Sequence, residues 1–71
     1  MKLGDFVKEK RLNLSMSQTD FGEHIGVSFV TINNIEKKHY CGLKTLRILS
    51  ENLNVTTEKL REMMVEHEDN E

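Results

Sequence analysis

The sequence predicts a small all-α domain of five helices, and three observations lead to this expectation. The chain has 71 residues and contains no proline. It has few of the alternating, β-branched runs that predict strands. Its apolar residues recur mainly at spacings of three and four, which is the period of an amphipathic helix. We therefore expect one domain of modest stability over residues 1–66, followed by an acidic, frayed tail over residues 67–71.

The first predicted helix spans about residues 3–12. Leu3, Phe6 and Val7 share one side of it, and its basic end suits the negative C-terminus of a helix dipole. A short connection follows, in which Leu14 and Met16 are expected to alternate inward.

The second predicted helix spans residues 18–25 and follows Ser17. Phe21 and Ile25 are four residues apart, so they lie on one face. Gly22 lies between them, where a Cβ would obstruct a second helix, and Gly26 suits a left-handed turn.

The third predicted helix spans about residues 29–37, with Ser28 as its N-cap. Ile32 and Ile35 form its inward side. Two short helices that cross sharply at a turn glycine are typical of a helix-turn-helix, whose second helix enters the DNA major groove. A loop over residues 38–42 follows.

The fourth predicted helix spans about residues 44–53, and its inner stripe is formed by Leu43, Leu46, Leu49 and Leu53. Asn54 is expected to end this helix in a left-handed conformation. Thr56 caps the fifth predicted helix, and Leu60 is its main inward residue.

Charge is distributed unevenly along the chain. The net charge is −2, which by itself argues against a nucleic-acid partner. Residues 1–50, however, hold eight Lys or Arg against five Asp or Glu, whereas residues 51–71 hold two against seven. The part with the helix-turn-helix pattern is mildly basic, and we expect weak non-specific binding to DNA.

The remaining composition excludes several classes of protein. There is no apolar run long enough to cross a bilayer and no signal-peptide pattern, so we expect a cytoplasmic protein without a membrane partner. Cys41 is the only cysteine, which we expect to be a partly buried, inert thiol. The histidines and this cysteine lack the paired spacing of a zinc site, and no catalytic motif is present. We predict no enzyme activity, metal, cofactor or small-molecule ligand.

Residues 3–62 resemble the Xre family, the phage-repressor-like (Cro-like) helix-turn-helix domains of bacterial and phage regulators. The first family segment is present as Ser17-Gln18, Gly22, Gly26-Val27-Ser28, Thr31-Ile32 and Ile35-Glu36. The second is present as Leu43-Lys44-Thr45-Leu46 and Leu53-Asn54-Val55-Thr56. Two segments in the right order make the resemblance specific. It implies a compact five-helix, lambda-repressor-like fold that binds double-stranded DNA.

The resemblance also implies which side chains meet DNA. Gln18, at the start of the second helix, would lie at the DNA backbone, where a helix N-terminus favours phosphate, or at an adjacent base. The third helix would present Ser28, Phe29, Val30, Thr31, Asn33 and Asn34. Asparagine can pair with adenine, and apolar groups can touch thymine methyls. We therefore expect A·T-leaning readout from Asn34, Phe29 and Val30, with Asn33 at the backbone or a flanking base.

Further phosphate contacts are implied for the basic stretch after the third helix, formed by Lys37, Lys38, His39 and Tyr40, and for Lys44. The resemblance also pairs Arg11 with Glu36. A bidentate pair of this kind would be structural and would fix the first helix against the third.

Other interpretations stay open at these positions. Gln18 also fits an ordinary exposed residue, and the two asparagines and the basic stretch also fit a solvated surface. Phe29 and Val30 replace side chains that are often polar in the family. They also fit packing against the connection before the second helix, or a patch that binds protein.

The last predicted helix ends in Met63, Met64 and Val65, which one helix of a small core cannot bury on one side. We expect some of this surface, with Ile48, to form a homodimer interface. The alternative is loose filling of the core by methionine.

The sequence thus predicts a sequence-specific transcriptional regulator, a repressor or autoregulator that acts as a homodimer. The alternative is a protein-interaction module that keeps the fold and has lost specific DNA binding.

Overall fold

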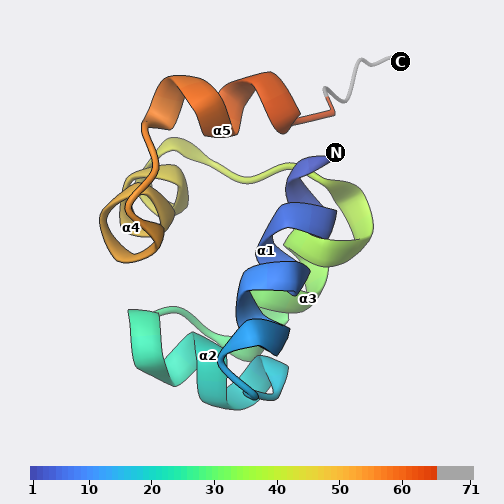
Figure 1. Cartoon of the computed structure of the whole chain (residues 1–71), viewed down its shortest axis with the longest axis vertical. Coiled ribbons are helices and arrows are strands. Elements are labelled where there is room, and N and C mark those ends of the chain that lie inside the picture. The colour runs from blue at the N-terminus through green and yellow to red at the C-terminus, as the bar shows by residue number, and fades with distance from the viewer. Residues whose placement is uncertain (66–71) are drawn as a thin grey trace.

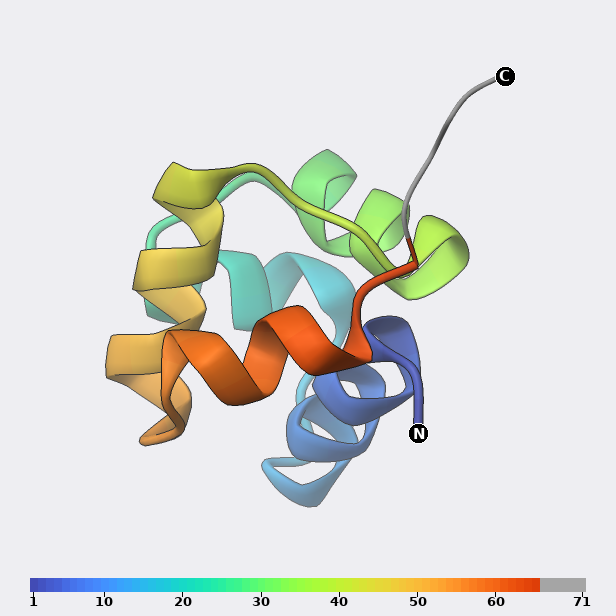
Figure 2. The same cartoon turned by 90° about the horizontal axis from the view of Figure 1, so that it is seen from above.

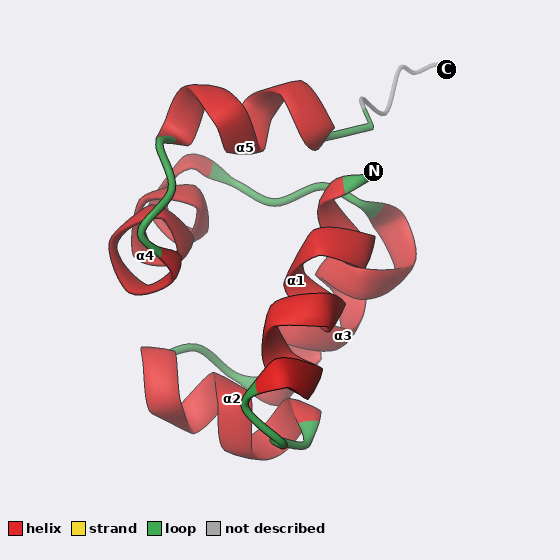
Figure 3. Ribbon diagram, viewed as in Figure 1, coloured by secondary structure: helices red, strands yellow, loops and turns green. Residues whose placement is uncertain are grey.

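Five α-helices and the loops between them make up residues 1–65, the part of the chain that the computed structural model describes. The helices are α1 (Leu3–Asn13), α2 (Gln18–Ile25), α3 (Phe29–Lys38), α4 (Leu43–Leu53) and α5 (Thr57–Met63) (Figure 1). No strand occurs among residues 1–65, as the ribbon coloured by secondary structure shows (Figure 3). The prediction of an all-α, five-helix fold is confirmed. His67 and the predicted tail over residues 67–71 lie outside the described residues.

Three helices begin at a hydroxyl side chain that caps them. The hydroxyl oxygens of Ser17, Ser28 and Thr56 accept backbone N–H groups at 3.0, 3.2 and 3.1 Å, from the third residue after each cap. These bonds satisfy donors that the first turn of a helix leaves unpaired. The two predicted caps, Ser28 and Thr56, are therefore present, and Ser17 is a third.

Three helices end at a residue in the left-handed region. Gly26, His39 and Asn54 end α2, α3 and α4 with φ values of 91°, 61° and 57°. Glycine and asparagine tolerate this conformation and were predicted to do so at these positions. His39 was not, because the sequence predicts a loop there but no glycine or asparagine marks the residue at which α3 ends.

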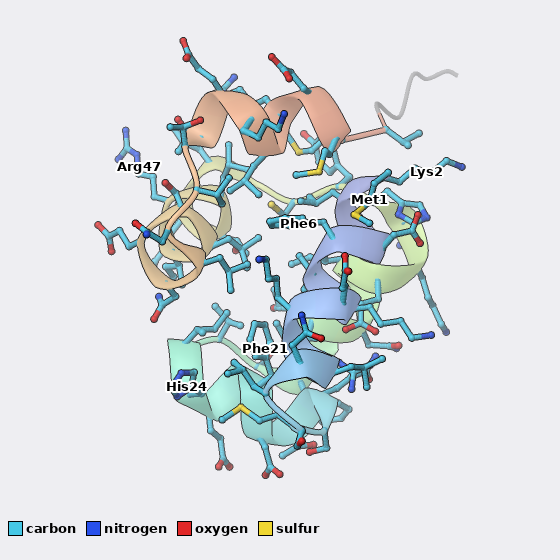
Figure 4. The ribbon with its side chains drawn as sticks, in the orientation of Figure 1. Met1, Lys2, Phe6, Phe21, His24 and Arg47 are labelled. Carbon is cyan, nitrogen blue, oxygen red and sulfur yellow. The ribbon has the colours of Figure 1, made fainter. Side chains whose placement is uncertain are left out.

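The core is formed by nine buried apolar side chains, contributed by all five helices: Leu3, Val7, Phe21, Ile25, Ile32, Ile35, Leu46, Leu49 and Leu60. α3 packs against both α1 and α2, and α5 packs against α4 and α1. Figure 4 shows Phe21 directed into the interior, whereas Lys2 and Arg47 point outward. The helix that carries the candidate site is thus held from two sides.

The prediction that two leucines, Leu43 and Leu14, face inward is wrong. Leu43 is 50% exposed, because a spacing of six residues places it about 120° around the helix from Leu49. Leu14 is 49% exposed. The connection that holds it is a tight turn with Ser15 at φ 58°, not an extended segment, so only Met16 returns to the core.

Helix ends differ from the predicted ones by one or two residues. α1 continues to Asn13, α3 includes Lys38, and α4 begins at Leu43. The fifth helix ends at Met63, and Met64 has extended backbone. The sequence had suggested that Met64 and Val65 belong to the face of this helix, and in the structure they do not.

Candidate nucleic-acid interface

The turn between α2 and α3 brings the two helices unusually close. A Cβ added to Gly22 would lie 2.6 Å from the carbonyl oxygen of Val27 and 3.3 Å from the carbonyl carbon of Ser28. Only glycine permits this approach of backbone to helix. Gly26, at φ 91°, then reverses the chain so that α3 crosses α2. The geometry is that of a helix-turn-helix.

The outward side of α3 carries the residues predicted to meet DNA. Ile32 and Ile35 are buried, while Phe29 and Val30 are 53% and 51% exposed. Asn34, Lys37 and Lys38 are also exposed, and Thr31 and Asn33 are half-buried. Figure 2 shows the start of α3, the loop after it and the start of α4 along one side of the molecule. Phe29 and Val30 are not used in the core, which leaves this side free to bind a partner.

Ser28 and Thr31 form a tight pair at the start of α3. The Ser28 hydroxyl accepts the Thr31 N–H at 3.2 Å, and the two hydroxyl oxygens lie 3.1 Å apart. One of these hydroxyls therefore donates to the other. Both side chains hold the first turn of α3 in shape, and both remain at its surface.

A buried ion pair connects α1 to α3. Arg11 Nε donates to Glu36 Oε2 at 2.8 Å, and Arg11 Nη2 donates to Glu36 Oε1 at 3.0 Å. Arg11 Nη1 donates to the carbonyl oxygen of Met16 at 2.9 Å. The side chains of the pair are only 11% and 8% exposed. The hydrogen bond to Glu36 raises the pKa of Arg11, and its effect outweighs that of burial.

Gln18 joins this pair and does not extend freely into solvent. Its Nε2 atom donates to Glu36 Oε1 at 3.2 Å and to Asn33 Oδ1 at 3.5 Å. Gln18 and Asn33 are both half-buried. The structure thus brings together two residues predicted to meet DNA and the two predicted to form the structural pair.

His39 is a residue that the sequence did not single out for this role. Its Nδ1 atom accepts the backbone N–H of Gly4 at 3.0 Å, and its carbonyl oxygen accepts the N–H of Val65 at 2.8 Å. The end of α3 therefore holds both the start of α1 and the segment after α5. The available signal was Gly4, an unexpected glycine in the first turn of a helix.

The basic stretch after α3 is only partly a loop. Lys37 and Lys38 are exposed in the last turn of α3, Tyr40 is 45% exposed, and Lys44 is exposed in the first turn of α4. Cys41 lies between them and is half-buried, and burial raises the pKa of its thiol. Positively charged side chains therefore lie at the end of α3 and at the start of α4.

The residues predicted for a homodimer interface do not form one exposed face. Ile48, Met63 and Met64 are half-buried and pack against the core, and Val65 is 39% exposed. A self-association surface near α5 would be formed by the outer parts of these side chains.

Neither a membrane-spanning helix nor a cluster of metal-ligating side chains occurs within residues 1–65. None of the helices there is both long and apolar enough to cross a membrane. Within the same range, no group of three or more His, Cys, Asp or Glu side chains is placed to hold a metal ion.

The fold has five helices, and a tight glycine turn joins α2 to α3. The outward side of α3 carries polar and basic side chains. These features define a DNA-binding regulator of the helix-turn-helix class. The family model described as Helix-turn-helix (HTH_3) matches residues 7–60. The chain belongs to this family, which is the Xre/Cro-like one. Neither the curated proteins nor the solved structures contain a significant match.

Proposed function

We propose that the protein is a sequence-specific transcriptional regulator that inserts α3 into the major groove. The observation that carries the proposal is the exposed side of α3, whose helix is fixed from behind by the buried pair of Arg11 and Glu36. A rigid helix with exposed amide, apolar and cationic side chains fits reading of base edges.

Phosphate contacts set the register of the protein on DNA. Lys37 and Lys38 are exposed in the last turn of α3, and Lys44 is exposed in the first turn of α4. Their charges neutralise phosphates without reading sequence. Ser28, Thr31 and Tyr40 supply polar atoms close to the same backbone.

Base readout falls to Asn34, Phe29 and Val30. Asn34 is exposed and can pair with adenine through both its amide atoms. Phe29 and Val30 present apolar surface, which matches the methyl group of thymine. The expected half-site is rich in A·T pairs.

The protein acts as a homodimer on a symmetric operator in this proposal. Two copies related by a two-fold axis place their α3 helices about 34 Å apart, which is one turn of DNA. The interface lies around Ile48, Met63, Met64 and Val65. Occupancy of the operator then blocks transcription, which makes the protein a cytoplasmic repressor or autoregulator without catalytic activity.

Selection from a randomised duplex pool tests the proposal. Wild-type protein and Asn34→Ala would be compared at about 50 and 200 mM salt, between which phosphate-dominated affinity falls steeply. We expect the wild type to enrich a two-fold symmetric, A·T-leaning motif, and the variant to lose preference at some positions. Failure to enrich any sequence at the lower salt would contradict the proposal.

A second candidate function is favoured by the two exposed apolar residues that open α3. Phe29 and Val30 are each about half exposed, and the whole chain has a net charge of −2. Both facts also fit a protein-interaction module. Replacing Phe29 with Ser would then abolish capture of a protein partner, while reversing the charges of Lys37 and Lys38 would leave the biological activity intact.

A further inference from the structure

The side chains behind α3 form a connected chain of hydrogen bonds, in which Arg11 and Gln18 donate and Glu36 and Asn33 accept. It begins at Arg11, passes through the Glu36 carboxylate and the Gln18 amide, and ends at Asn33 on the surface of α3. We refer to these residues, Arg11, Glu36, Gln18 and Asn33, as the relay. Every link joins residues from different helices.

The chemistry of Glu36 fixes the orientation of Gln18. An ionised carboxylate only accepts hydrogen bonds, and both oxygens of Glu36 already accept one from Arg11. The Gln18 atom that lies 3.2 Å from Glu36 Oε1 must therefore be the amide nitrogen. Its oxygen, which would repel the carboxylate, points elsewhere.

The orientation of Gln18 in turn fixes that of Asn33. The second N–H of Gln18 faces Asn33, whose Oδ1 lies 3.5 Å from Gln18 Nε2. A reversed Asn33 amide would place N–H groups against N–H groups. The oxygen of Asn33 thus faces Gln18, and its NH2 group faces away from the relay.

We propose that the relay orients Asn33 as a hydrogen-bond donor, so that Asn33 binds an acceptor on DNA, either a phosphate oxygen or the acceptor edge of a base. Gln18 is then a positioning residue that acts through Asn33. Bidentate pairing with adenine needs both amide atoms, and this task falls to Asn34. The inference rests on the proposed function, because it assigns roles within the same interface.

The free protein provides the first test. In ¹⁵N-labelled protein, Gln18→Met keeps the Arg11–Glu36 pair and removes the amide that donates to both Glu36 and Asn33. We expect the side-chain NH2 signals of Asn33 to shift, and those of Asn34, the matched control one residue along, to stay in place. Equal shifts at both asparagines, or none at Asn33, would overturn the inference whatever the protein binds.

A double-mutant cycle on DNA affinity provides the second test. On the duplex that the wild type selects, Gln18→Met and Asn33→Ala are each expected to weaken binding about three- to tenfold. The double variant should bind as Asn33→Ala does, because Gln18 acts through Asn33. Gln18→Met combined with Asn34→Ala should give multiplied losses. Multiplied losses for the first pair would overturn the inference and place Gln18 in direct contact with DNA.

The same series distinguishes the two acceptors. Loss of affinity by Asn33→Ala on all duplexes alike identifies a phosphate, and relaxed preference at one base pair identifies a base edge. Thermal unfolding of each variant checks that the fold is kept. If the wild type selects no duplex, the proposed function fails together with the role of Asn33; if it does and the cycle shows no coupling, only the inference fails.

Discussion

At the scale of single residues, Arg11 shows how hydrogen bonds offset the burial of a charge. Three of its nitrogens donate to Glu36 and to the carbonyl oxygen of Met16 at 2.8 to 3.0 Å. The planar guanidinium matches the carboxylate in a way that the single ammonium of lysine cannot. The residue thereby links α1 to α3 and to the turn that precedes α2.

Removing one partner of this pair should destabilise the fold strongly. We expect Arg11→Met to lower the free energy of unfolding by about 3–5 kcal/mol, because Glu36 is left buried without a counter-charge. Replacing both residues with Met should recover part of the loss. Urea unfolding followed by circular dichroism measures both, with Arg61→Met on the exposed side of α5 as control. A loss below about 1 kcal/mol for Arg11→Met would mean that the pair behaves like an exposed one.

Cys41 offers a second prediction at this scale. Burial raises the pKa of its thiol, so less of the reactive thiolate is present at a given pH. We expect alkylation by iodoacetamide at pH 8 to be slower than that of a free cysteine, and to reach the rate of a free cysteine in denaturant. An equally fast reaction in the folded protein would show that the thiol is not shielded.

At the scale of elements, the first turn of α1 is docked on the last turn of α3. A Cβ on Gly4 would lie 2.6 Å from each of three atoms, the carbonyl oxygens of Ile35 and Glu36 and the Nδ1 of His39. The N–H of Gly4 is satisfied by this same nitrogen. The close approach of α1 to α3 and the hydrogen bond that caps the start of α1 are therefore parts of one contact.

Gly4→Ala is accordingly expected to destabilise the protein by about 1–3 kcal/mol, since backbone carbonyls cannot move aside as a side chain would. Gly42→Ser is the matched control. A Cβ there meets nothing within 4 Å, and a serine could cap α4, so we expect a change of only a few tenths of a kcal/mol. Similar thermal unfolding of Gly4→Ala and the wild type would refute the close contact.

The elements that could be predicted from sequence are those set by neighbouring residues. Ser28 and Thr56 cap helices, and Gly26 and Asn54 end them, through bonds within a few positions of the chain. The bond from Gly4 to His39 joins residues 35 positions apart, so no local pattern indicates it. The same holds for the candidate site: spacing indicates which side of α3 is outward, but not that Gln18 turns back to Glu36.

At the scale of the whole molecule, charge separates along the chain. Residues 1–65 contain ten Lys or Arg and eight Asp or Glu, although the complete chain has a net charge of −2. With so few excess cations, non-specific affinity should be low, and specificity has to come from α3. Dimerisation would add a second reading helix and thereby raise the effective affinity.

Self-association is tested most simply at Val65, the exposed member of the proposed interface. We expect Val65→Glu to shift the protein toward monomer in analytical ultracentrifugation and to weaken binding to a two-fold symmetric duplex. Leu12→Glu, at a side chain that is also exposed but outside the proposed interface, should do neither. If Val65→Glu dimerises like the wild type, the interface lies elsewhere.

In the proposed function, DNA meets the molecule along α3 and the loop after it. This contact is tested most directly by comparing the duplex affinity of two double charge reversals, Lys37→Glu with Lys38→Glu on α3 and Lys59→Glu with Arg61→Glu on α5. Both change the net charge equally, and all four residues are exposed. We predict that the α3 pair lowers affinity at least about tenfold and flattens its salt dependence, while the α5 pair has a much smaller effect. Equal losses from both pairs, or none from the α3 pair, would show that DNA does not bind along α3.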